Sequence, residues 1–351
     1  MPTPFWPQMS PGIAAPIIAS FKALFLSRSE QFLAQGRYIS GPASRDPSNA
    51  TDVAVLQPGL IMGKISSVVN GLGTVGFYAP SILGLTSLAI AATDTTITLP
   101  AAVCTEIARR CGASGTVTVT GPPVASGTVR SLTATYSAVG ATTITITALG
   151  VTEVQTFNFA NSPSGNFVLA IVDKNGVVQY TQPIAYSSTV ATLKANLQAA
   201  TDAALAVNAI VWGGSAVTAI TATFSGTGYA NLPQTLIVAD TDAWSAGSLS
   251  ITRTTAGVDG RFVTSSIVAP TDGSQNPLSF ITDWSPGIPV TDGNGNSVAQ
   301  VDFGLFPIWG VLDTTQIVNF PADPSLRTWL EQQLSSATGG KFTFGGTSGP
   351  Y

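Results

Sequence analysis

The feature of this chain that most constrains its fold is a period-two alternation of small polar residues with β-branched or apolar ones. The alternation runs through residues 95–99, 116–120, 129–137 and 142–148. Because successive side chains of a strand point to opposite faces of a sheet, such segments predict strands with one buried face. Thr and Val also favour strands, since their branched side chains fit a pleated surface. The sequence therefore predicts a mainly β fold of sandwich-like or barrel-like modules.

Three segments carry helix signals instead. Pro100 opens the first, which ends at Gly112 with two arginines in its last turn. The second, residues 189–206, has apolar residues every three or four positions, the pattern of one buried helix face. The third begins with Asp323 as its N-cap and ends near Gly339. We therefore expect a few short helices among the strands.

Residues 1–52 have a different texture. Four prolines among the first eleven residues favour an extended, unpaired backbone. An amphipathic stretch follows, with five apolar residues on a helix-like stripe: Ile17, Phe21, Leu24, Phe25 and Phe32. We expect residues 1–52 to form an N-terminal arm with a short helix.

The rest of the chain divides into segments with different sequence patterns. Residues 53–84 are strand-like up to Pro80, and after Gly260 the sequence changes character, with a turn at Asp292-Gly293-Asn294-Gly295 and strand-like residues 298–306. We predict a split β domain from residues 53–84 and 261–351, interrupted by two insertions. Residues 85–151 form an inserted β-rich domain, and residues 152–260 form an inserted immunoglobulin-like α+β module with an Asn175-Gly176 hairpin turn.

The charge content limits the possible functions. Charged residues make up 9% of the chain and the net charge is −4, against about 25% charged residues in an ordinary soluble domain. No concentrated positive field exists to neutralise phosphates, so we expect no nucleic-acid partner. The longest uncharged stretches are rich in Gly and Pro or alternate with Thr, so we expect no membrane partner.

Histidine is absent from the chain. It is the side chain that most often performs general acid-base work and most often binds metals in proteins. The two cysteines, Cys104 and Cys111, lie seven residues apart on a predicted helix, about 10.5 Å along its axis and too far for a disulfide. We therefore expect free thiols, no cofactor, no metal site, and a protein that is not an enzyme.

Three short motifs suggest chemistry that their contexts do not favour. Gly71-Leu72-Gly73-Thr74-Val75-Gly76 has the letters of a dinucleotide-binding loop, but the residues that follow continue as strand, which favours a hairpin turn. Asp292-Gly293-Asn294-Gly295-Asn296 begins like a calcium loop but lacks its sixth-position Gly and twelfth-position Glu. Asp240 and Asp242 are a carboxylate pair that we interpret as turn residues, with sugar hydrolysis as a minority hypothesis.

Two stretches carry a resemblance to known proteins. The first is Leu56-Gln57-Pro58-Gly59-Leu60-Ile61-Met62-Gly63-Lys64-Ile65, followed by Gly76-Phe77-Tyr78-Ala79-Pro80. The second comprises Asp272-Gly273-Ser274-Gln275, Gly310-Val311-Leu312-Asp313 and the run from Ile317 to Asp323. Together they cover about a third of the chain and resemble the tailed-bacteriophage head decoration proteins, also called capsid cement proteins. The insertion between them departs from a minimal cement protein.

The resemblance implies a location and partners. Such proteins sit on the outer surface of the virion capsid, often as homotrimers, and hold neighbouring subunits of the major capsid protein together against internal DNA pressure. The arm would then add backbone hydrogen bonds to capsid edge strands. Its apolar residues would fill pockets of the capsid, and the candidates for this contact are Phe5, Trp6, Phe21, Leu24 and Phe25.

Two other functions stay open. The main alternative is a tail-associated or adhesin-like receptor-binding protein, in which the inserted modules bind the host surface. That alternative predicts that residues 152–258 bind cells by themselves. A carboxylate-based glycan hydrolase that uses Asp240 ranks third, because no substrate cleft can be inferred around it.

Overall fold

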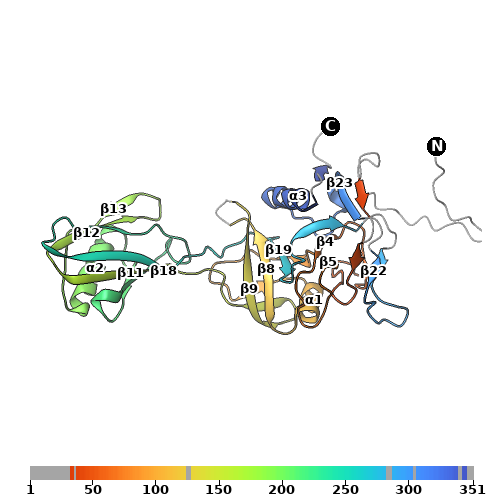
Figure 1. Ribbon diagram of the computed structural model, residues 1–351, viewed down its shortest axis with the longest axis horizontal. Helices are drawn as coiled ribbons and strands as arrows, with labels where there is room; N and C mark the ends of the chain where they lie inside the picture. The colour runs from red at the N-terminus through yellow and green to blue at the C-terminus, as the bar shows by residue number, and fades with distance from the viewer. Residues whose placement is uncertain are drawn as a thin grey trace, which may run out of the picture. The chain divides into compact units, whose positions relative to one another are not determined.

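The computed structural model describes residues 32–34, 37–123, 128–281, 287–302, 306–338 and 342–345. The fold is mainly β, as predicted, with short helices between sheets. The chain divides into two compact units: residues 1–84 with 269–351 form unit 1, and residues 85–268 form unit 2. Unit 1 is therefore built from both ends of the chain, and red and blue elements lie together in Figure 1.

Unit 1 contains a five-stranded sheet in the order β20-β4-β5-β2-β22. These strands are Pro277–Phe280, Ile61–Lys64, Tyr78–Pro80, Tyr38–Ile39 and Val301–Asp302. A two-stranded sheet pairs β21 (Ile288–Pro289) with β3 (Val55–Leu56). A three-stranded sheet has the order β1-β23-β24, with bounds Phe32–Ala34, Phe306–Asp313 and Phe342–Gly345.

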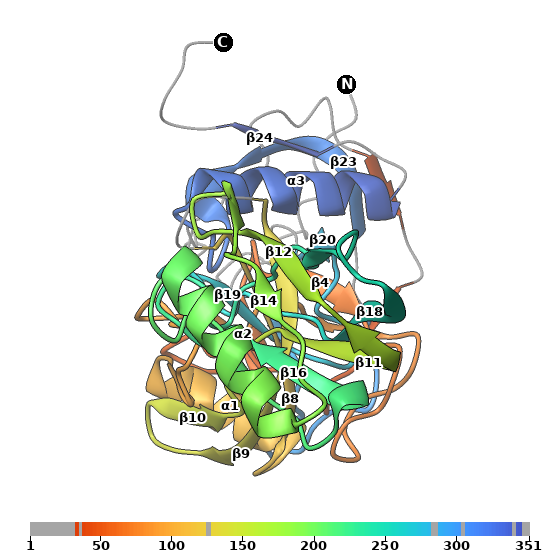
Figure 2. The same cartoon turned by 90° about the vertical axis from the view of Figure 1, so that its left-hand side faces the viewer.

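The core of unit 1 joins strands from distant parts of the sequence. Ile39, Met62 and Ile281 are fully buried in one cluster with five other apolar residues. Helix α3 (Pro324–Thr338) follows the 3-10 turn η2 (Thr314–Gln316) and packs against β20, β23 and β24 (Figure 2). Its Leu326, Leu330 and Leu334 are fully buried and form one apolar face of the helix.

Most of a six-stranded sheet, in the order β6-β19-β8-β9-β10-β7, belongs to unit 2. Its strands are Gly84–Leu85, Ile267–Pro270, Gly115–Gly121, Arg130–Val139, Thr143–Ile146 and Thr96–Thr98. Helix α1 (Ala101–Cys111) has Pro100 as its N-cap and Gly112 as its C-cap, close to the predicted bounds. Cys104 and Cys111 are buried and form no disulfide with each other, as the helical spacing predicted.

Residues 151–258 of unit 2 contain two further sheets. One has the order β15-β16-β11-β18, with bounds Val211–Gly213, Ile220–Thr223, Val154–Ser164 and Ala246–Thr255. In the other, β12 (Asn166–Val172) pairs with β13 (Val178–Tyr180), β14 (Ile184–Ala185) and β17 (Val238–Asp240). Helix α2 (Val190–Ala204) lies beside β14 and β15 and is in the foreground of Figure 2.

Aromatic rings fill the core of residues 151–258. Phe157 and Trp212 meet edge to face with ring centroids 4.9 Å apart, and Phe159 meets Phe167 in the same way at 5.6 Å. Leu193 and Leu197 of α2 are fully buried in the same cluster. Trp212 therefore anchors this core, and its indole nitrogen donates to Thr201 Oγ1 at 3.1 Å.

The structure differs from the sequence predictions at four places. Phe32 begins strand β1, so the helix-like stripe does not extend to it. Residues 38–52, which we assigned to the arm, supply β2 and the buried Ile39 and Ala43 of unit 1. The pattern of residues 217–224 also predicts a strand, but residues 217–219 form the 3-10 turn η1 (Val217–Ala219). A strand is likewise predicted for residues 235–238, of which only Val238 lies in β17. In the last two cases alternating sequence is used in turns that connect strands.

Candidate functional site

The two stretches that carry the resemblance contact each other in unit 1 through glycines. A Cβ added to Gly63 would lie 2.0 Å from the carbonyl oxygen of Ser274 and 2.6 Å from that of Asn276. A Cβ on Gly59 would lie 2.0 Å from the carbonyl oxygen of Gln316. Gly59 also has a φ of 86°, which disfavours residues with a Cβ. Only glycine therefore fits at these two positions without a shift of the facing backbone.

The turn that follows Asp272 is held by hydrogen bonds within the second stretch and by bonds from Ser66 and Ser67, which directly follow Ile65 of the first stretch. The buried carboxylate of Asp272 accepts from the Ser274 N–H at 3.0 Å and the Ser274 hydroxyl at 2.6 Å. The Asp272 carbonyl oxygen accepts from the N–H groups of Ser66 and Ser67 at 2.7 and 3.0 Å. Gly273 has a φ of 100° and lies close against Ser66. These motif residues therefore fix the backbone conformation of the turn.

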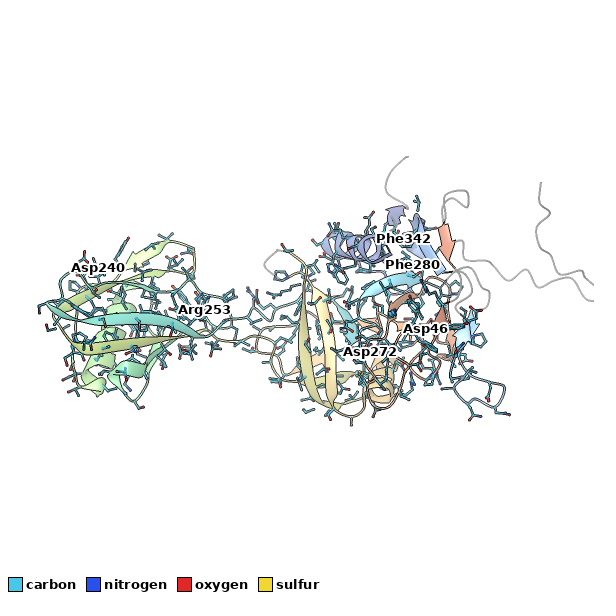
Figure 3. The ribbon with its side chains drawn as sticks, in the orientation of Figure 1. Asp46, Asp240, Arg253, Asp272, Phe280 and Phe342 are labelled. Carbon is cyan, nitrogen blue, oxygen red and sulfur yellow. The ribbon has the colours of Figure 1, made fainter. Side chains whose placement is uncertain are left out.

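A second buried carboxylate, Asp46, organises the loop before β3 (Figure 3). It accepts hydrogen bonds from the Ser48 N–H at 3.0 Å, the Gln57 N–H at 3.2 Å and the Gln57 amide nitrogen at 3.1 Å. Burial raises the pKa of the Asp46 carboxyl, and the hydrogen bonds from Gln57 and Ser48 offset only part of that effect. Gln57 belongs to the first motif stretch, so this loop is fixed to the same part of unit 1.

A buried polar network in unit 2 was missed in the sequence analysis. The Glu153 carboxylate accepts from the Arg253 Nε at 2.9 Å, the Gln155 Nε2 at 2.7 Å and the Gln234 N–H at 2.8 Å. Burial alone would raise the pKa of Glu153, but the bonds from Gln234, Gln155, Arg253 and Gly257 together hold it below its ordinary value. The network attaches the segment around Gln234 to strands β11 and β18.

Strand parity was the signal that could have revealed this network. Residues 153, 155, 157 and 159 alternate along one strand, and Phe157 and Phe159 are buried. Since residues two apart share a face, Glu153 and Gln155 continue the buried face of the two phenylalanines. A carboxylate and an amide on that face require partners, because an unpaired buried polar group is costly.

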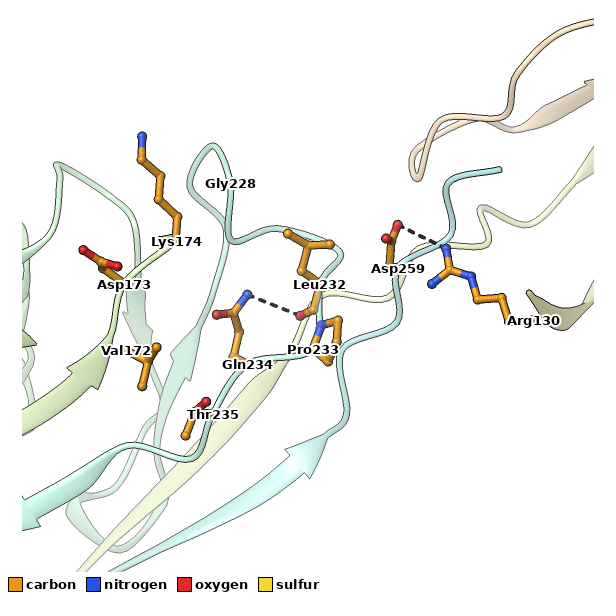
Figure 4. A pocket seen from close by; sticks show the side chains of 10 residues that line it. All are labelled: Arg130, Val172, Asp173, Lys174, Gly228, Leu232, Pro233, Gln234, Thr235 and Asp259. Atoms are coloured by element: carbon orange, nitrogen blue, oxygen red, sulfur yellow. Dashed lines mark hydrogen bonds and ion pairs between the residues drawn. The ribbon is translucent and has the colours of Figure 1, made fainter. Parts of the chain in front are cut away.

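Unit 2 also contains two hollows, of about 360 and 230 Å³, which share Asp173 and Lys174 as lining residues. Figure 4 shows the larger one, lined also by Gln234, Arg130 and Asp259. Its carboxylates are already bound: Asp173 accepts from two turn N–H groups and Gln179, and Asp259 accepts from Arg261. Burial would raise the pKa of Asp259, but bonds from Arg261 and the charge of Arg130 lower it. The hollow therefore offers a polar rim and lacks an acid-base pair.

The sequence motifs that suggested chemistry lie in turns. Asn70 and Gly71 have φ values of 50° and 69°, and an isolated bridge joins Val69 to Leu72, so no helix opens at these glycines. This confirms the turn interpretation of the glycine motif. The Asp292 carboxylate accepts from the N–H groups of Asn294 and Asn296 at 2.9 and 2.8 Å. These bonds, first that from Asn296, lower the pKa of Asp292.

Asp240 and Asp242 lie at the exposed end of β17, where the Asp242 N–H donates to Asp240 at 3.0 Å. This is a local turn contact, and Figure 3 places Asp240 far from Arg253 within the module. The five candidate capsid contacts, Phe5, Trp6, Phe21, Leu24 and Phe25, lie outside the described residues. Among the residues that are described, no group of three metal-binding side chains comes together.

Within the same described ranges, no helix has the length and apolar content needed to cross a membrane. No protein-family model matches the chain, and no curated protein matches it in sequence.

Proposed function

We propose that this chain is a structural virion protein that decorates and cements the outer surface of a tailed-phage capsid. One observation carries the proposal: the stretches that resemble decoration proteins come from both sides of the insertion and pack on each other through Gly59, Gly63 and the Asp272 turn. Short stretches that resemble a family only by coincidence would have no reason to meet in one unit. This contact supports the resemblance, because the close packing of the two stretches explains why glycine occurs at these positions.

The proposed mechanism uses the N-terminal arm. Strand β1 pairs with β23, so the residues before Phe32 are joined to unit 1 at the edge of a three-stranded sheet. An arm attached there adds a strand to a capsid edge, while Phe5, Trp6, Phe21, Leu24 and Phe25 fill apolar pockets of the major capsid protein. A low charge content suits this contact, because few charged groups lose their hydration.

The decisive experiment is co-sedimentation of the purified chain with undecorated phage heads, with the mass of the free protein measured in parallel. We expect a homotrimer that saturates the heads. Deletion of residues 1–30, which keeps β1 intact, abolishes binding while circular dichroism still reports a folded β protein. The matched control replaces the same thirty residues by a Gly/Ser linker of equal length, which restores length but not apolar side chains and does not restore binding.

Two outcomes count against the proposal. Binding that survives deletion of residues 1–30 would exclude the arm as the capsid contact. A full-length chain that ignores heads but binds host cells would favour the receptor-binding alternative, and residues 152–258 would then be the segment to test.

A further inference from the structure

Three Asn-Gly dipeptides lie in exposed turns, at residues 70–71, 175–176 and 294–295. Asparagine before glycine is prone to spontaneous deamidation, because glycine has no side chain that shields its backbone nitrogen from the preceding amide. A Cβ added to any of these three glycines would meet nothing within 4 Å. Since steric access is alike at the three sites, hydrogen bonds and charge must decide which one reacts.

Two of the three turns are held by an aspartate that lies two residues before the asparagine. The Asp173 carboxylate accepts from the Asn175 N–H at 2.8 Å. The Asp292 carboxylate accepts from the Asn294 N–H at 2.9 Å. Each carboxylate also accepts from the N–H of the residue after the glycine, at 2.9 and 2.8 Å respectively. Each aspartate therefore holds its turn closed on both sides of the Asn-Gly bond.

The glycine nitrogens of these two turns are hydrogen-bonded as well. The Gly176 N–H donates to the Asp173 carbonyl oxygen at 3.0 Å. The Gly295 N–H donates to the Asp292 carbonyl oxygen, also at 3.0 Å. A glycine nitrogen must lose its proton before it can attack the asparagine. The hydrogen bond and the negative charge of the nearby carboxylate both oppose that step.

The turn at Asn70 is built differently. Asn70 and Gly71 have φ values of 50° and 69°, and the Leu72 N–H donates to the Val69 carbonyl oxygen at 3.0 Å. This is a two-residue hairpin turn of type I′. Within the part of the chain that the structure describes, the Gly71 N–H donates to no acceptor. Its nitrogen therefore loses no hydrogen bond when it reacts.

The local charge also differs at this turn. Val68, which is 50% exposed, occupies the position that aspartate has in the other two turns. No charged residue occurs in the sequence between Lys64 and Asp94. This segment therefore supplies no negative charge that would oppose loss of the Gly71 proton.

We propose that Asn70 is the preferred site of deamidation in this protein, because its turn lacks the protection that Asp173 and Asp292 give the other two sites. The Gly71 nitrogen loses its proton and bonds to Asn70 Cγ, the Cγ–Nδ2 bond breaks, and the leaving nitrogen takes up a proton and departs as ammonia. Water then opens the cyclic imide. Its addition at Cγ gives aspartate, and its addition at the backbone carbonyl carbon gives isoaspartate. The inference does not depend on capsid binding.

Deamidation changes both the charge and the backbone of this turn. The product carboxylate at position 70 is the first charge between Lys64 and Asp94. Isoaspartate also lengthens the main chain by one carbon, so the turn no longer joins Val69 to Leu72 with the observed bridge. The deamidated protein is therefore separable from the original by ion exchange.

Peptide mapping by mass spectrometry tests the proposal on the full chain, incubated at pH 8 and 37 °C. Asn175 and Asn294 are internal controls, since they have the same dipeptide and are also exposed. We expect Asn70 to convert about tenfold faster than either control, because their glycine nitrogens must first be released. Asn70→Gln should remove the main acidic species on ion exchange, and Asn294→Gln should leave it. Equal rates at the three sites, or a slower rate at Asn70, would overturn the proposal.

Two substitutions at exposed positions test the stated cause. Asp292→Ala removes a protecting carboxylate, so Asn294 should react severalfold faster. Val68→Asp places a carboxylate two residues before Asn70 and should slow its reaction severalfold. Circular dichroism verifies that both variants are folded. Unchanged rates in both would contradict protection by aspartate and overturn the proposal. Unfolding in urea is the last control, because the three rates should converge once the turns are lost.

Discussion

Gly63 shows how closely the motif stretches of unit 1 approach each other. We predict that Gly63→Ala lowers the free energy of unfolding by about 3 kcal/mol, because its Cβ would meet two backbone oxygens and the strands must separate. Gly293→Ala is the control, since a Cβ there meets nothing within 4 Å and the change should cost little. Urea unfolding of both variants measures the difference. Equal stability of the two would show that β4 and the Asp272 turn are farther apart than described.

Glu153 is a buried carboxylate whose contribution to the stability of unit 2 depends on pH. Its pKa in the folded state lies below the ordinary value of 4.5. A carboxylate with a lowered pKa adds stability above its unfolded pKa and loses it as the pH falls through the folded pKa. We predict that Glu153→Gln costs about 2 kcal/mol at pH 7, through the lost charge-assisted bonds to Arg253 and Gln155. The difference from the wild type should shrink steadily below pH 4.5.

Denaturant unfolding between pH 3 and pH 7 checks this prediction. Asp240→Asn serves as the control, because Asp240 is exposed and lies in a turn. Its difference from the wild type should stay small at every pH. A Glu153→Gln difference that does not vary with pH would mean that the carboxylate is not ionised in the folded protein. Asp259 retains its own acid sensitivity in both proteins, since its pKa is also lowered.

Among the secondary-structure elements, the features that depend on a few neighbouring residues were predicted from the sequence. Helices α1, α2 and α3 lie close to their predicted bounds, because caps and apolar spacing are read within a few residues. The hairpin at Asn175-Gly176 was predicted and confirmed, with Gly176 at a φ of 81°. Pairing partners were not predictable, since alternation does not specify which strand lies beside which. The parallel pairs β2 with β5 and β23 with β24 had no signal in the sequence.

The same limit explains what was missed in the candidate site. Strands β13 and β17 flank β12, and β17 lies about 70 residues farther along the chain, so this sheet could not be assembled from local patterns. The burial of Glu153 could have been inferred only from strand parity, because Glu153 lies on the same strand face as apolar residues that are buried. Residues two apart from a buried phenylalanine are therefore worth testing for burial even when they are charged.

Helix caps allow a matched comparison of elements. The Asp323 carboxylate accepts from the N–H groups of Ser325 and Leu326 at 2.8 and 3.2 Å, at the start of α3. Thr189, the N-cap of α2, makes no such side-chain bond. We predict that Asp323→Ala costs about 1 kcal/mol of stability, whereas Thr189→Ala costs only a few tenths. Thermal melting followed by circular dichroism measures both, and equal losses would contradict the assigned cap.

The whole molecule is one unit interrupted by another, and this arrangement makes the insertion separable. The chain passes into unit 2 at β6 and returns at β19, and these strands are hydrogen-bonded neighbours in one sheet. Adjacent strands lie about 4.8 Å apart, so a short turn can join them. The core of unit 1, with Ile39, Met62 and Ile281, comes from the residues outside the insertion.

We therefore predict that replacement of residues 86–266 by an Asn-Gly turn yields a folded protein that still binds undecorated heads. We expect this result because the replaced segment contributes none of the motif contacts at Gly59, Gly63 and Asp272. Co-sedimentation with heads measures binding, and the chemical-shift dispersion of the amide protons in an NMR spectrum reports folding. A shortened chain that folds but no longer binds heads would show that the capsid contact lies in the insertion and not in unit 1.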